Sequence, residues 1–481
     1  MRRYNGNRIP WSCLLLAFMS SSAFAENVLL IISDDLRANV LGCYGDTITH
    51  TPNLDRLAAE GIRFDAAYCQ GTWCAPSRTS LMRSRHCDGQ GTTLGETLIT
   101  NGVQSVRVGK IFHMRVPGDI IAGTDGQDVP QCWNRAINSP GQEAHSPGPY
   151  ACLNQDIFTD SLENRQTTKM PHRPFVTVRI DGIGDQQPDH RSASRANELL
   201  AEFADSEAPF FLAVGLVRPH YPMVAPDVLF RRYPFQTMPL PVTHNDSLEH
   251  IPAPGIAGSR SSKVGFDVLI DNQRRMWTGY RACVEFVDHQ VGRMIQQLQN
   301  LGLDENTTVI FTSDHGYHLG DHTFWQKSNL HEQVARVPLI IRPSRRSEIQ
   351  PTANHAPVEL TDLYPTVCDL VGAPTPEHCQ GTSLHPIMRD RNHPWRTGTL
   401  TIDGSKSKRH FLWRTNRYAY MAYATGDTEL YDMQNDPHQQ VNLAESPDHA
   451  DIRSSLATQL TSRLSSLGIQ QSTVAKERNR L

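Results

Sequence analysis

The residues best suited to chemistry are two clusters with acidic side chains, each directly following an apolar run. Asp34 and Asp35 follow the first run, and Asp314 and His315 follow the second. Adjacent carboxylates repel one another unless a cation holds them together. A single Asp-Asp pair is more often a solvated turn or a helix cap, but two such clusters favour a divalent-metal site. Oxygen-rich ligation points to Ca²⁺ or Mg²⁺, of which Ca²⁺ accepts more ligands and looser geometry. An imidazole such as His315 fits such a site less well.

Basic and histidine side chains supply the complementary charge. Lys110 with His113, and then Arg218 with His220, also follow apolar runs, and Lys327 comes soon after the second acidic cluster. Each alone is ordinarily a surface charge or a core histidine. Together with the acids they suit a tetrahedral oxyanion, with a metal on one oxygen, lysine on others and histidine moving protons. The set predicts a metal-dependent esterase that acts on a sulfate or phosphate ester.

A cysteine lies between these clusters along the chain, in the segment Cys74-Ala75-Pro76-Ser77-Arg78. Pro76 is expected near the start of a helix, because proline fits the first helical turn. The amino end of that helix would attract anions, since its backbone N–H groups are unpaired there. We therefore expect Cys74 to lie where the acidic and basic residues meet. Cysteine counting alone would instead assign Cys74 to a disulfide.

The elements that must position these side chains alternate between strand and helix. Continuous apolar runs predict strands buried on both faces, at residues 27–33, 106–109, 210–216, 308–312 and 338–342. Helical spacing predicts helices at 52–61, 193–203, 275–301 and 358–371. This alternation is typical of an α/β fold with a large, mostly parallel central sheet. In such sheets ligands bind at the carboxyl ends of the strands, where the acidic and basic residues lie.

The pattern changes near residues 392–397. Strand-like segments follow at 398–402, 411–414, 418–423 and 429–432, and a helix is predicted near 449–467. We expect a smaller α+β subdomain with an antiparallel sheet. The predicted organisation is a signal peptide at 1–25, a catalytic domain at 26–395 and a C-terminal subdomain at 396–481. Residues 118–161 and the Pro-rich residues 222–265 are expected to form long loops, which carry specificity or no function.

The amino terminus has the pattern of a secretory signal. An Arg-rich start precedes a short apolar run, and Ala23-Phe24-Ala25 is typical of a cleavage site. The run is shorter than the ~20 residues that a spanning helix needs, and no later segment of the sequence could span a bilayer. We therefore expect a secreted or periplasmic protein.

Composition gives no support for nucleic-acid binding and leaves the pairing of the cysteines open. The formal net charge is −4 over 481 residues and the pI is about 6.6, so global charge gives no reason to expect nucleic-acid binding. There are ten cysteines. In an oxidising compartment, Cys132 with Cys152 and Cys368 with Cys379 are the first pairs expected to close loops. The alternative is that several cysteines are buried thiols.

The segment from Cys74 to Arg78 resembles the C-x-P-S-R signature of the type I sulfatases, in which the cysteine is oxidised to formylglycine after translation. Similar segments occur in the family's order over most of the chain, including VLLIISDDLR, TPNLDRLA, VGKIFH, FFLAVGLVRPHYP, FTSDHGYHLGDH and ELYDMQNDPHQQVNLA. Lys110-x-x-His113 and the Arg-Pro-His at 218–220 resemble the iduronate-2-sulfatase branch. The resemblance implies an alkaline-phosphatase-like sandwich and removal of sulfate from a sulfated glycan, with a uronate 2-O-sulfate as one candidate.

The resemblance also implies roles for individual residues. The implied Ca²⁺ ligands are Asp34, Asp35, the modified Cys74, Asp314 and His315. The implied catalytic residues are Cys74, Arg78, His113 and His220, and the implied substrate-binding residues are Lys110, Arg218 and Lys327. A hydroxyl of the hydrated aldehyde would attack sulfur, His220 would protonate the leaving alcohol, and His113 would deprotonate the second hydroxyl to release sulfate. The implied partners are a sulfated oligo- or polysaccharide and a formylglycine-generating enzyme.

Two positions depart from the family pattern. Ser84 stands where glycine is usual, which would weaken recognition by the maturing enzyme. Arg218 stands where related iduronate sulfatases have lysine, and its planar fork would change the sugar contact. Two other functions stay open: hydrolysis of a phosphate or phosphonate monoester with the same nucleophile, and glycan binding by a protein that never matures.

Overall fold

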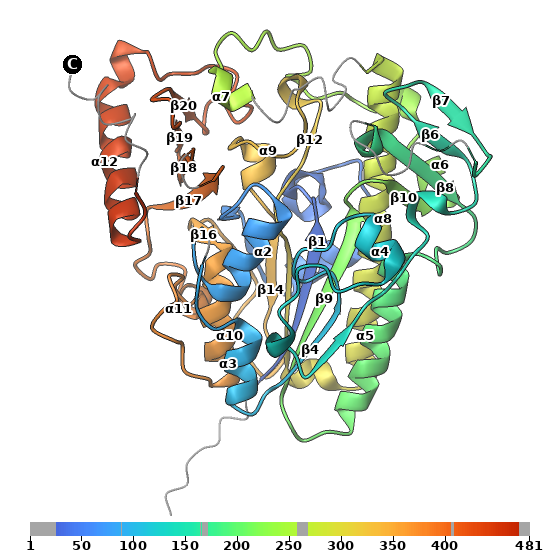
Figure 1. The fold of residues 1–481 in the computed structure, drawn as a ribbon. Helices are drawn as coiled ribbons and strands as arrows, with labels where there is room; N and C mark the ends of the chain where they lie inside the picture. The colour runs from blue at the N-terminus through green and yellow to red at the C-terminus, as the bar shows by residue number, and fades with distance from the viewer. Residues whose placement is uncertain are drawn as a thin grey trace, which may run out of the picture.

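A computed structural model describes residues 26–470 except 88, 164, 166–171, 257–267 and 406–407. The predicted signal peptide at 1–25 lies outside these residues. Within them, helices cover both faces of a central sheet, and a smaller sheet with its own helix lies beside the sandwich (Figure 1).

The central sheet has eight strands in the order β15-β2-β14-β11-β1-β9-β4-β5. Among these described strands, β14 alone runs antiparallel to its neighbours. The strands are β1 (Asn27–Asp34), β2 (Ile62–Phe64), β4 (Gln104–Gly109), β5 (Arg135–Ile137), β9 (Phe210–Pro219), β11 (Thr307–Ser313), β14 (Leu339–Arg342) and β15 (Thr352–Asn354). The predicted α/β fold with a large, mostly parallel sheet is therefore confirmed.

The continuous apolar run of β1 is explained by two cores, one on each face of the sheet. Successive side chains of a strand point to opposite faces, so Leu29 and Ile31 enter one core while Val28, Leu30 and Ile32 enter the other. The first core includes α1 (Pro52–Ala59), α5 (Pro188–Ala204) and α8 (Ile270–Asn300). The second includes α2 (Cys74–Arg83), α3 (Leu94–Thr100) and α10 (Leu363–Val371). Figure 1 shows α5 and α8 on the side opposite α3 and α10.

Residues 118–161 contain more regular structure than the predicted loop. They form α4 (Gly118–Ala122), β5, β6 (Tyr150–Cys152) and β7 (Ile157–Thr159). β6 and β7 join β8 (Val176–Ile180) and β10 (Met223–Pro226) in a second sheet, in the order β10-β8-β6-β7. Strands of three residues are too short to show a period, so local patterning did not reveal them.

The C-terminal part has the predicted antiparallel sheet and helix. The strands are β17 (Gly398–Asp403), β18 (His410–Thr415), β19 (Tyr418–Ala422) and β20 (Thr428–Asp432), paired in that order. Helix α12 (Ala450–Ser466) buries Leu456, Leu460 and Leu464, which are spaced by four residues and therefore share one helical face. The boundary at residue 396 stays a prediction.

Shorter elements complete the described chain. The helices are α6 (Asp227–Arg232), α7 (Ala253–Ile256), α9 (Glu332–Ala335) and α11 (His385–Arg389). The strands are β3 (Ala67–Tyr68), β12 (His318–Leu319), β13 (Trp325–Gln326) and β16 (Val358–Glu359). The predicted helix at 358–371 is thus a short strand, a 3-10 turn and then α10. None of the helices in the described ranges is both long and apolar enough to cross a bilayer.

The two predicted disulfides are not formed. Cys132 packs in the second core, whereas Cys152 packs in a separate cluster around the second sheet. Cys368 is buried and Cys379 half-buried, and both carry unbonded thiols. The expectation of a Cys132–Cys152 and a Cys368–Cys379 bridge is therefore corrected: the four side chains are accommodated as thiols, two of them in different cores.

We expect Ile31→Ala to lower the free energy of unfolding by about 2–5 kcal/mol, because it leaves a cavity in a fully buried strand. Urea denaturation followed by circular dichroism measures the change. Ile183→Ala is the matched control, since Ile183 is 69% exposed and its truncation should change stability little. Equal losses in the two variants would contradict the assignment of β1 to the core.

Candidate active site

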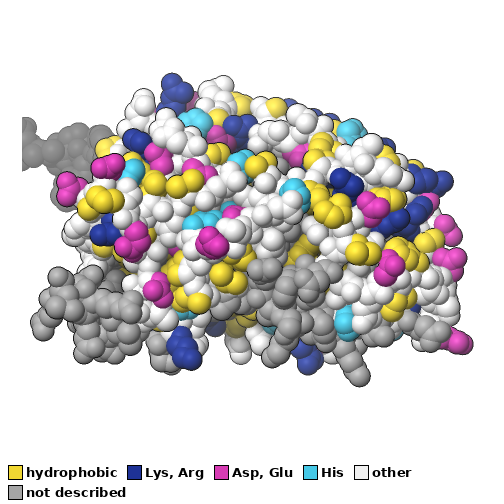
Figure 2. Space-filling model, turned by 90° about the horizontal axis from the view of Figure 1, so that it is seen from above, with side chains coloured by type: hydrophobic (Ala, Val, Ile, Leu, Met, Phe, Trp, Pro, Cys, Tyr) yellow, Lys and Arg dark blue, Asp and Glu magenta, His cyan; other side chains and the backbone are white. Residues whose placement is uncertain are grey.

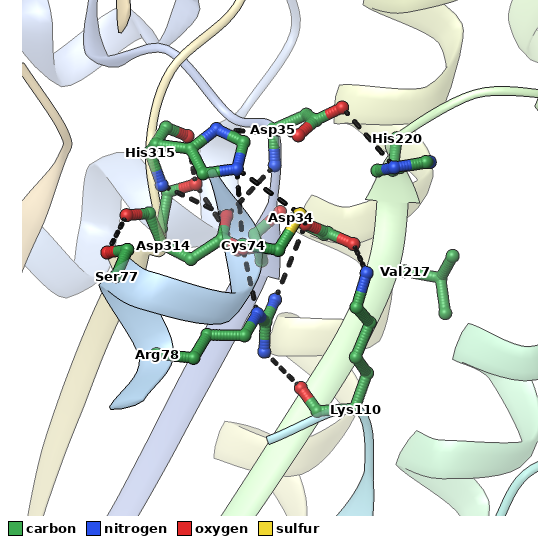
Figure 3. A network of polar contacts seen from close by, with 12 residues as sticks. Asp34, Asp35, Cys74, Ser77, Arg78, Lys110, Val217, His220, Asp314 and His315 are labelled. Atoms are coloured by element: carbon green, nitrogen blue, oxygen red, sulfur yellow. Dashed lines mark hydrogen bonds and ion pairs between the residues drawn. The ribbon is translucent and has the colours of Figure 1, made fainter. Parts of the chain in front are cut away.

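Two neighbouring strands bring the acidic clusters together. β1 and β11 are parallel, with Ser33 opposite Ser313, so the residues that follow them emerge side by side from one edge of the sheet. The backbone N–H of Asp35 donates to Oδ1 of Asp314 across this edge, at 3.2 Å. Figure 3 shows the acidic residues of both strands turned toward the same point.

Cys74 lies at that point, at the first residue of α2. Its Sγ lies 3.3 Å from Oδ1 of Asp34, 3.3 Å from Nε2 of His315 and 3.2 Å from Nζ of Lys327. The side chain is buried, and helix α2 presents its amino end here, which favours negative charge. The structure thus brings together the cysteine, both acidic clusters and one of the predicted lysines.

Three cations compensate the buried carboxylates. Nε of Arg78 donates to Oδ2 of Asp314 at 2.8 Å, Nζ of Lys110 donates to Asp34, and Nζ of Lys327 donates to Oδ1 of Asp35 at 2.6 Å. All of these side chains are buried. Such pairing is needed because an unpaired charge in the interior is very costly.

Burial and these partners shift the pKa values in different directions. Burial alone would raise the pKa of Asp34, but Lys110 and other nearby cations hold it well below its usual range. Burial, opposed by Lys327, raises the pKa of Asp35 to about 7. Burial opposes protonation of His315, yet Asp314 raises the pKa of its imidazole to about 9. The carboxylate of Asp35 therefore binds a proton or a cation more readily than the carboxylate of Asp34 does.

The donor set fits a divalent cation. One ligand atom from each of Asp34, Asp35, Cys74 and His315 lies within 4.8 Å of the others. Oδ2 of Asp35 is buried and accepts no hydrogen bond from the described residues, which leaves it available to a cation. Asp314 borders this group, with Oδ2 held by Arg78 and Oδ1 accepting from two backbone N–H groups.

Lysines lie near the two histidines predicted to move protons, His220 and His113. Nδ1 of His220 donates to the carbonyl of Tyr221 at 2.6 Å, and its Nε2 lies 3.8 Å from Asp35. Burial, with Lys327 nearby, keeps the pKa of His220 well below its usual range. Burial, with Lys110 nearby, lowers the pKa of His113 to about 4. Both imidazoles are thus neutral at pH 7 in this structure.

Arg218 is held in a buried network of its own. Its guanidinium is fully buried, donates to Glu143 and donates to the carbonyl of His220 at 2.6 Å. Asp189 accepts from the backbone N–H of Arg218 at 2.9 Å. The side chain therefore holds the backbone that carries His220, and no contact with a sugar follows from its position. Nothing in the local sequence of Glu143 or Asp189 indicated this role.

Ser84 ends helix α2 in the left-handed conformation, with φ 50° and ψ 43°. Glycine adopts this conformation without steric cost, which explains why glycine suits the position. Here the Oγ of Ser84 donates to the carbonyl of Thr361 at 2.8 Å and accepts from the N–H of Gly381 at 3.0 Å. These two hydrogen bonds help to hold the serine in place, so the departure from glycine is accommodated in the folded chain.

Trp73 is a residue that the sequence reasoning did not single out. It precedes Cys74 in extended backbone and is 47% exposed. Nζ of Lys327 lies 5.9 Å from the centre of its ring. The only signal in the sequence was its place next to the cysteine. Figure 2 shows the face above the strand ends, where acidic, basic and histidine side chains are interspersed among hydrophobic ones.

Comparison with known proteins agrees with this geometry. Residues 26–373 match the Sulfatase family, and residues 320–466 match the C-terminal region of N-sulphoglucosamine sulphohydrolase. Mouse iduronate 2-sulfatase is 30% identical over 416 residues, which cover 76% of this chain and 72% of that protein. A sulfatase of Formosa agariphila is 28% identical, covering 87% of this chain and 83% of the relative.

Solved structures share the fold. The phosphonate monoester hydrolase of Agrobacterium radiobacter superposes with a TM-score of 0.74 at 22% identity, covering 92% of this chain and 96% of that chain. A protein solved with its substrate D-glucosamine-2-N,6-O-disulfate superposes with a TM-score of 0.73 at 20% identity, covering 92% of this chain and 98% of that chain. These likenesses confirm the alkaline-phosphatase-like architecture. The family match over residues 26–373 and the 30% identical relative lead to one conclusion: the chain belongs to the sulfatase family and is an iduronate-2-sulfatase-like sulfatase.

Proposed function

We propose that this protein removes sulfate from a sulfated glycan after Cys74 has been oxidised to formylglycine. The observation that carries the proposal is the position of the Cys74 Sγ, within 3.3 Å of Asp34, His315 and Lys327 at the amino end of a helix. A thiol in this setting is surrounded by groups that bind an oxyanion and a cation. Cys74 carries a free thiol and is not part of a disulfide.

A bound Ca²⁺ would supply positive charge to the sulfate oxygens. The residues that would hold it are Asp34, Asp35, residue 74, Asp314 and His315. The three carboxylates favour Ca²⁺ over a softer metal, and Ca²⁺ tolerates looser geometry than Mg²⁺. The buried Oδ2 of Asp35, with no hydrogen bond in the described chain, supports a cation at this place.

The nucleophile would be residue 74. Its hydrated aldehyde would supply one hydroxyl for attack on sulfur and a second whose deprotonation allows sulfate to leave. Nη2 of Arg78 is buried, lies 3.6 Å from Oδ1 of Asp34 and makes no hydrogen bond to the described residues, so it can orient a hydroxyl on residue 74. The other guanidinium nitrogens are already held by Asp314 and by backbone carbonyls.

The remaining polar residues would bind sulfate and move protons. Lys110 and Lys327 would bind sulfate oxygens, exchanging part of their carboxylate contacts for the substrate. An anionic sulfate beside His220 favours its protonated form, which is the form that donates to the leaving alcohol. His113, kept neutral by its low pKa, would accept the proton from the second hydroxyl.

The substrate class follows from the relatives and from the exposed aromatic ring. Mouse iduronate 2-sulfatase is among the relatives, which makes a uronate 2-O-sulfate the first candidate. Trp73 offers an exposed ring beside residue 74, suited to contact the apolar face of a sugar. In this proposal, Arg218 positions His220 by holding its backbone. The signal-like pattern at 1–25 supports export, and a formylglycine-generating enzyme is the required partner.

The second candidate is hydrolysis of a phosphate or phosphonate monoester. It is favoured by a 26% identical relative described as a multifunctional alkaline phosphatase superfamily protein, which covers 88% of this chain. Phosphate and sulfate monoesters place similar oxygens around the central atom, so the geometry at Cys74 suits both. The non-catalytic alternative would apply if residue 74 stays a cysteine.

We expect protein from a host that forms formylglycine to hydrolyse 4-nitrophenyl sulfate faster than 4-nitrophenyl phosphate, and to desulfate a uronate 2-O-sulfated disaccharide. Cys74→Ala should abolish turnover and leave the circular dichroism spectrum unchanged, because it removes the nucleophile without opening a large cavity. Faster phosphate turnover would favour the second candidate. Full activity of Cys74→Ala would refute the mechanism.

We expect Ser84→Gly to raise the fraction of formylglycine at residue 74, since the variant restores the residue that the maturing enzyme usually meets. Mass spectrometry of the peptide that spans residue 74 measures this, because formylglycine is about 18 Da lighter than cysteine. Ser405→Gly, in an exposed loop, is the matched control and should change nothing. An unchanged fraction in Ser84→Gly would show that Ser84 does not limit maturation.

The pH dependence should reflect His113. A base works in its unprotonated form, and burial lowers the pKa of this histidine to about 4. In saturating Ca²⁺, kcat should therefore show no loss as pH falls from 7 to 5 and should drop as pH approaches 4, because His113 acts after the alcohol has left. His393→Gln, at an exposed position, should leave the profile unchanged. An acid limb centred near the ordinary histidine pKa of about 6.5 would contradict the role of His113.

A further inference from the structure

A second group of metal-ligating side chains lies apart from the catalytic residues. Oδ2 of Asp246 is 2.6 Å from Nδ1 of His322 and 3.6 Å from Nε2 of His250. One ligand atom from each of the three lies within 4.8 Å of the others. Asp246 and His250 belong to the segment before α7, and His322 lies in the loop between β12 and β13. Two segments far apart in sequence therefore meet at this group.

A buried nitrogen atom of this group lacks a hydrogen-bond partner among the described residues. Nε2 of His250 faces Asp246, is buried and makes no hydrogen bond there. The side chain of His322 is fully buried, and its Nδ1 is the nitrogen that faces Asp246. Buried polar atoms are normally paired, so the free Nε2 of His250 calls for an explanation.

The backbone also holds His322 in an uncommon conformation. Its φ is 52° and its ψ is 29°, a left-handed geometry that costs energy for a residue with a side chain. Its N–H donates to Oγ1 of Thr243 at 3.0 Å, so the same segment that carries Asp246 also holds this backbone. The result is that the imidazole of His322 is directed at Asp246.

We propose that Asp246, His250 and His322 bind a Zn²⁺-type transition-metal ion, separate from the cation of the catalytic site. Two imidazoles and one carboxylate are a typical zinc donor set, and three protein ligands leave a fourth position for water. Ca²⁺ and Mg²⁺ prefer oxygen donors and suit this group less well. The group differs in this from the carboxylate-rich site around Cys74.

The ion would fasten the segment of Asp246 to the loop that leads to the catalytic lysine. Asp321, next to His322, pairs with Arg37 at 2.7 Å, and Lys327 follows in the same stretch of chain. The ion's role is structural, because the three ligands are not among the residues that contact Cys74. Loss of the metal should therefore lower stability first and affect turnover only through the loop.

Zinc binding by the full-length protein tests the proposal. The protein carries Cys74→Ser, which removes the thiol of the catalytic group, and is kept in excess Ca²⁺, which competes for the catalytic carboxylates. After addition of Zn²⁺ and gel filtration, metal analysis should find one zinc per chain. In a thermal melt, Zn²⁺ should raise the midpoint of unfolding. His250→Ala in the same background should weaken zinc binding at least about tenfold, since even groups that only support a ligand change affinity by that much.

Two further variants keep the result decisive. His244→Ala is the matched control, because this histidine lies in the same segment but bonds to the carbonyl of Pro241 instead of joining the group. It should retain both the zinc and the thermal shift. Asp246→Asn should weaken zinc binding and reduce the thermal shift, as His250→Ala does, while circular dichroism shows a folded chain. Absence of zinc from the Cys74→Ser protein, or full retention by folded His250→Ala, would overturn the proposal.

Discussion

The structure depends on how it keeps three carboxylates buried at one edge of a sheet. Asp34, Asp35 and Asp314 are fully buried, and carboxylates taken out of water require partners of opposite charge. Helix α2, the end of β4 and the loop after β13 each contribute one cation to this requirement. The same compensation creates the site, because cations placed to neutralise acids can also bind the oxygens of an anionic ester.

The two-core sandwich is what makes this arrangement rigid. β1 is buried on both faces, so its register against β9 and β11 is determined by packing on both sides. A shift of one residue would exchange the two cores and move Asp34 away from its partners. Positions farther out support the site in the same way: the pair of Glu143 and Arg218 holds the backbone of His220.

The protein combines two kinds of polar cluster with different chemistry. Around Cys74, oxygen donors and fixed cations suit a hard cation and a tetrahedral anion. Around His322, two imidazoles and one carboxylate suit a softer metal. The two clusters are connected through the chain between Asp314 and Lys327. The proposed zinc ion and the contact of Lys327 with Asp35 would hold this loop at both ends.

The sequence by itself determined the fold class and most of the site's members. Continuous apolar runs identified the buried strands, and residues at their ends, such as Asp34 and Lys110, are placed by topology alone, because parallel strands deliver their carboxyl ends to one edge. Only the tertiary structure decided which groups pair there. It placed Arg218 against Glu143 and separated Cys132 from Cys152. The physical reason is that burial, charge pairing and thiol packing depend on contacts between distant segments, which no local period or spacing encodes.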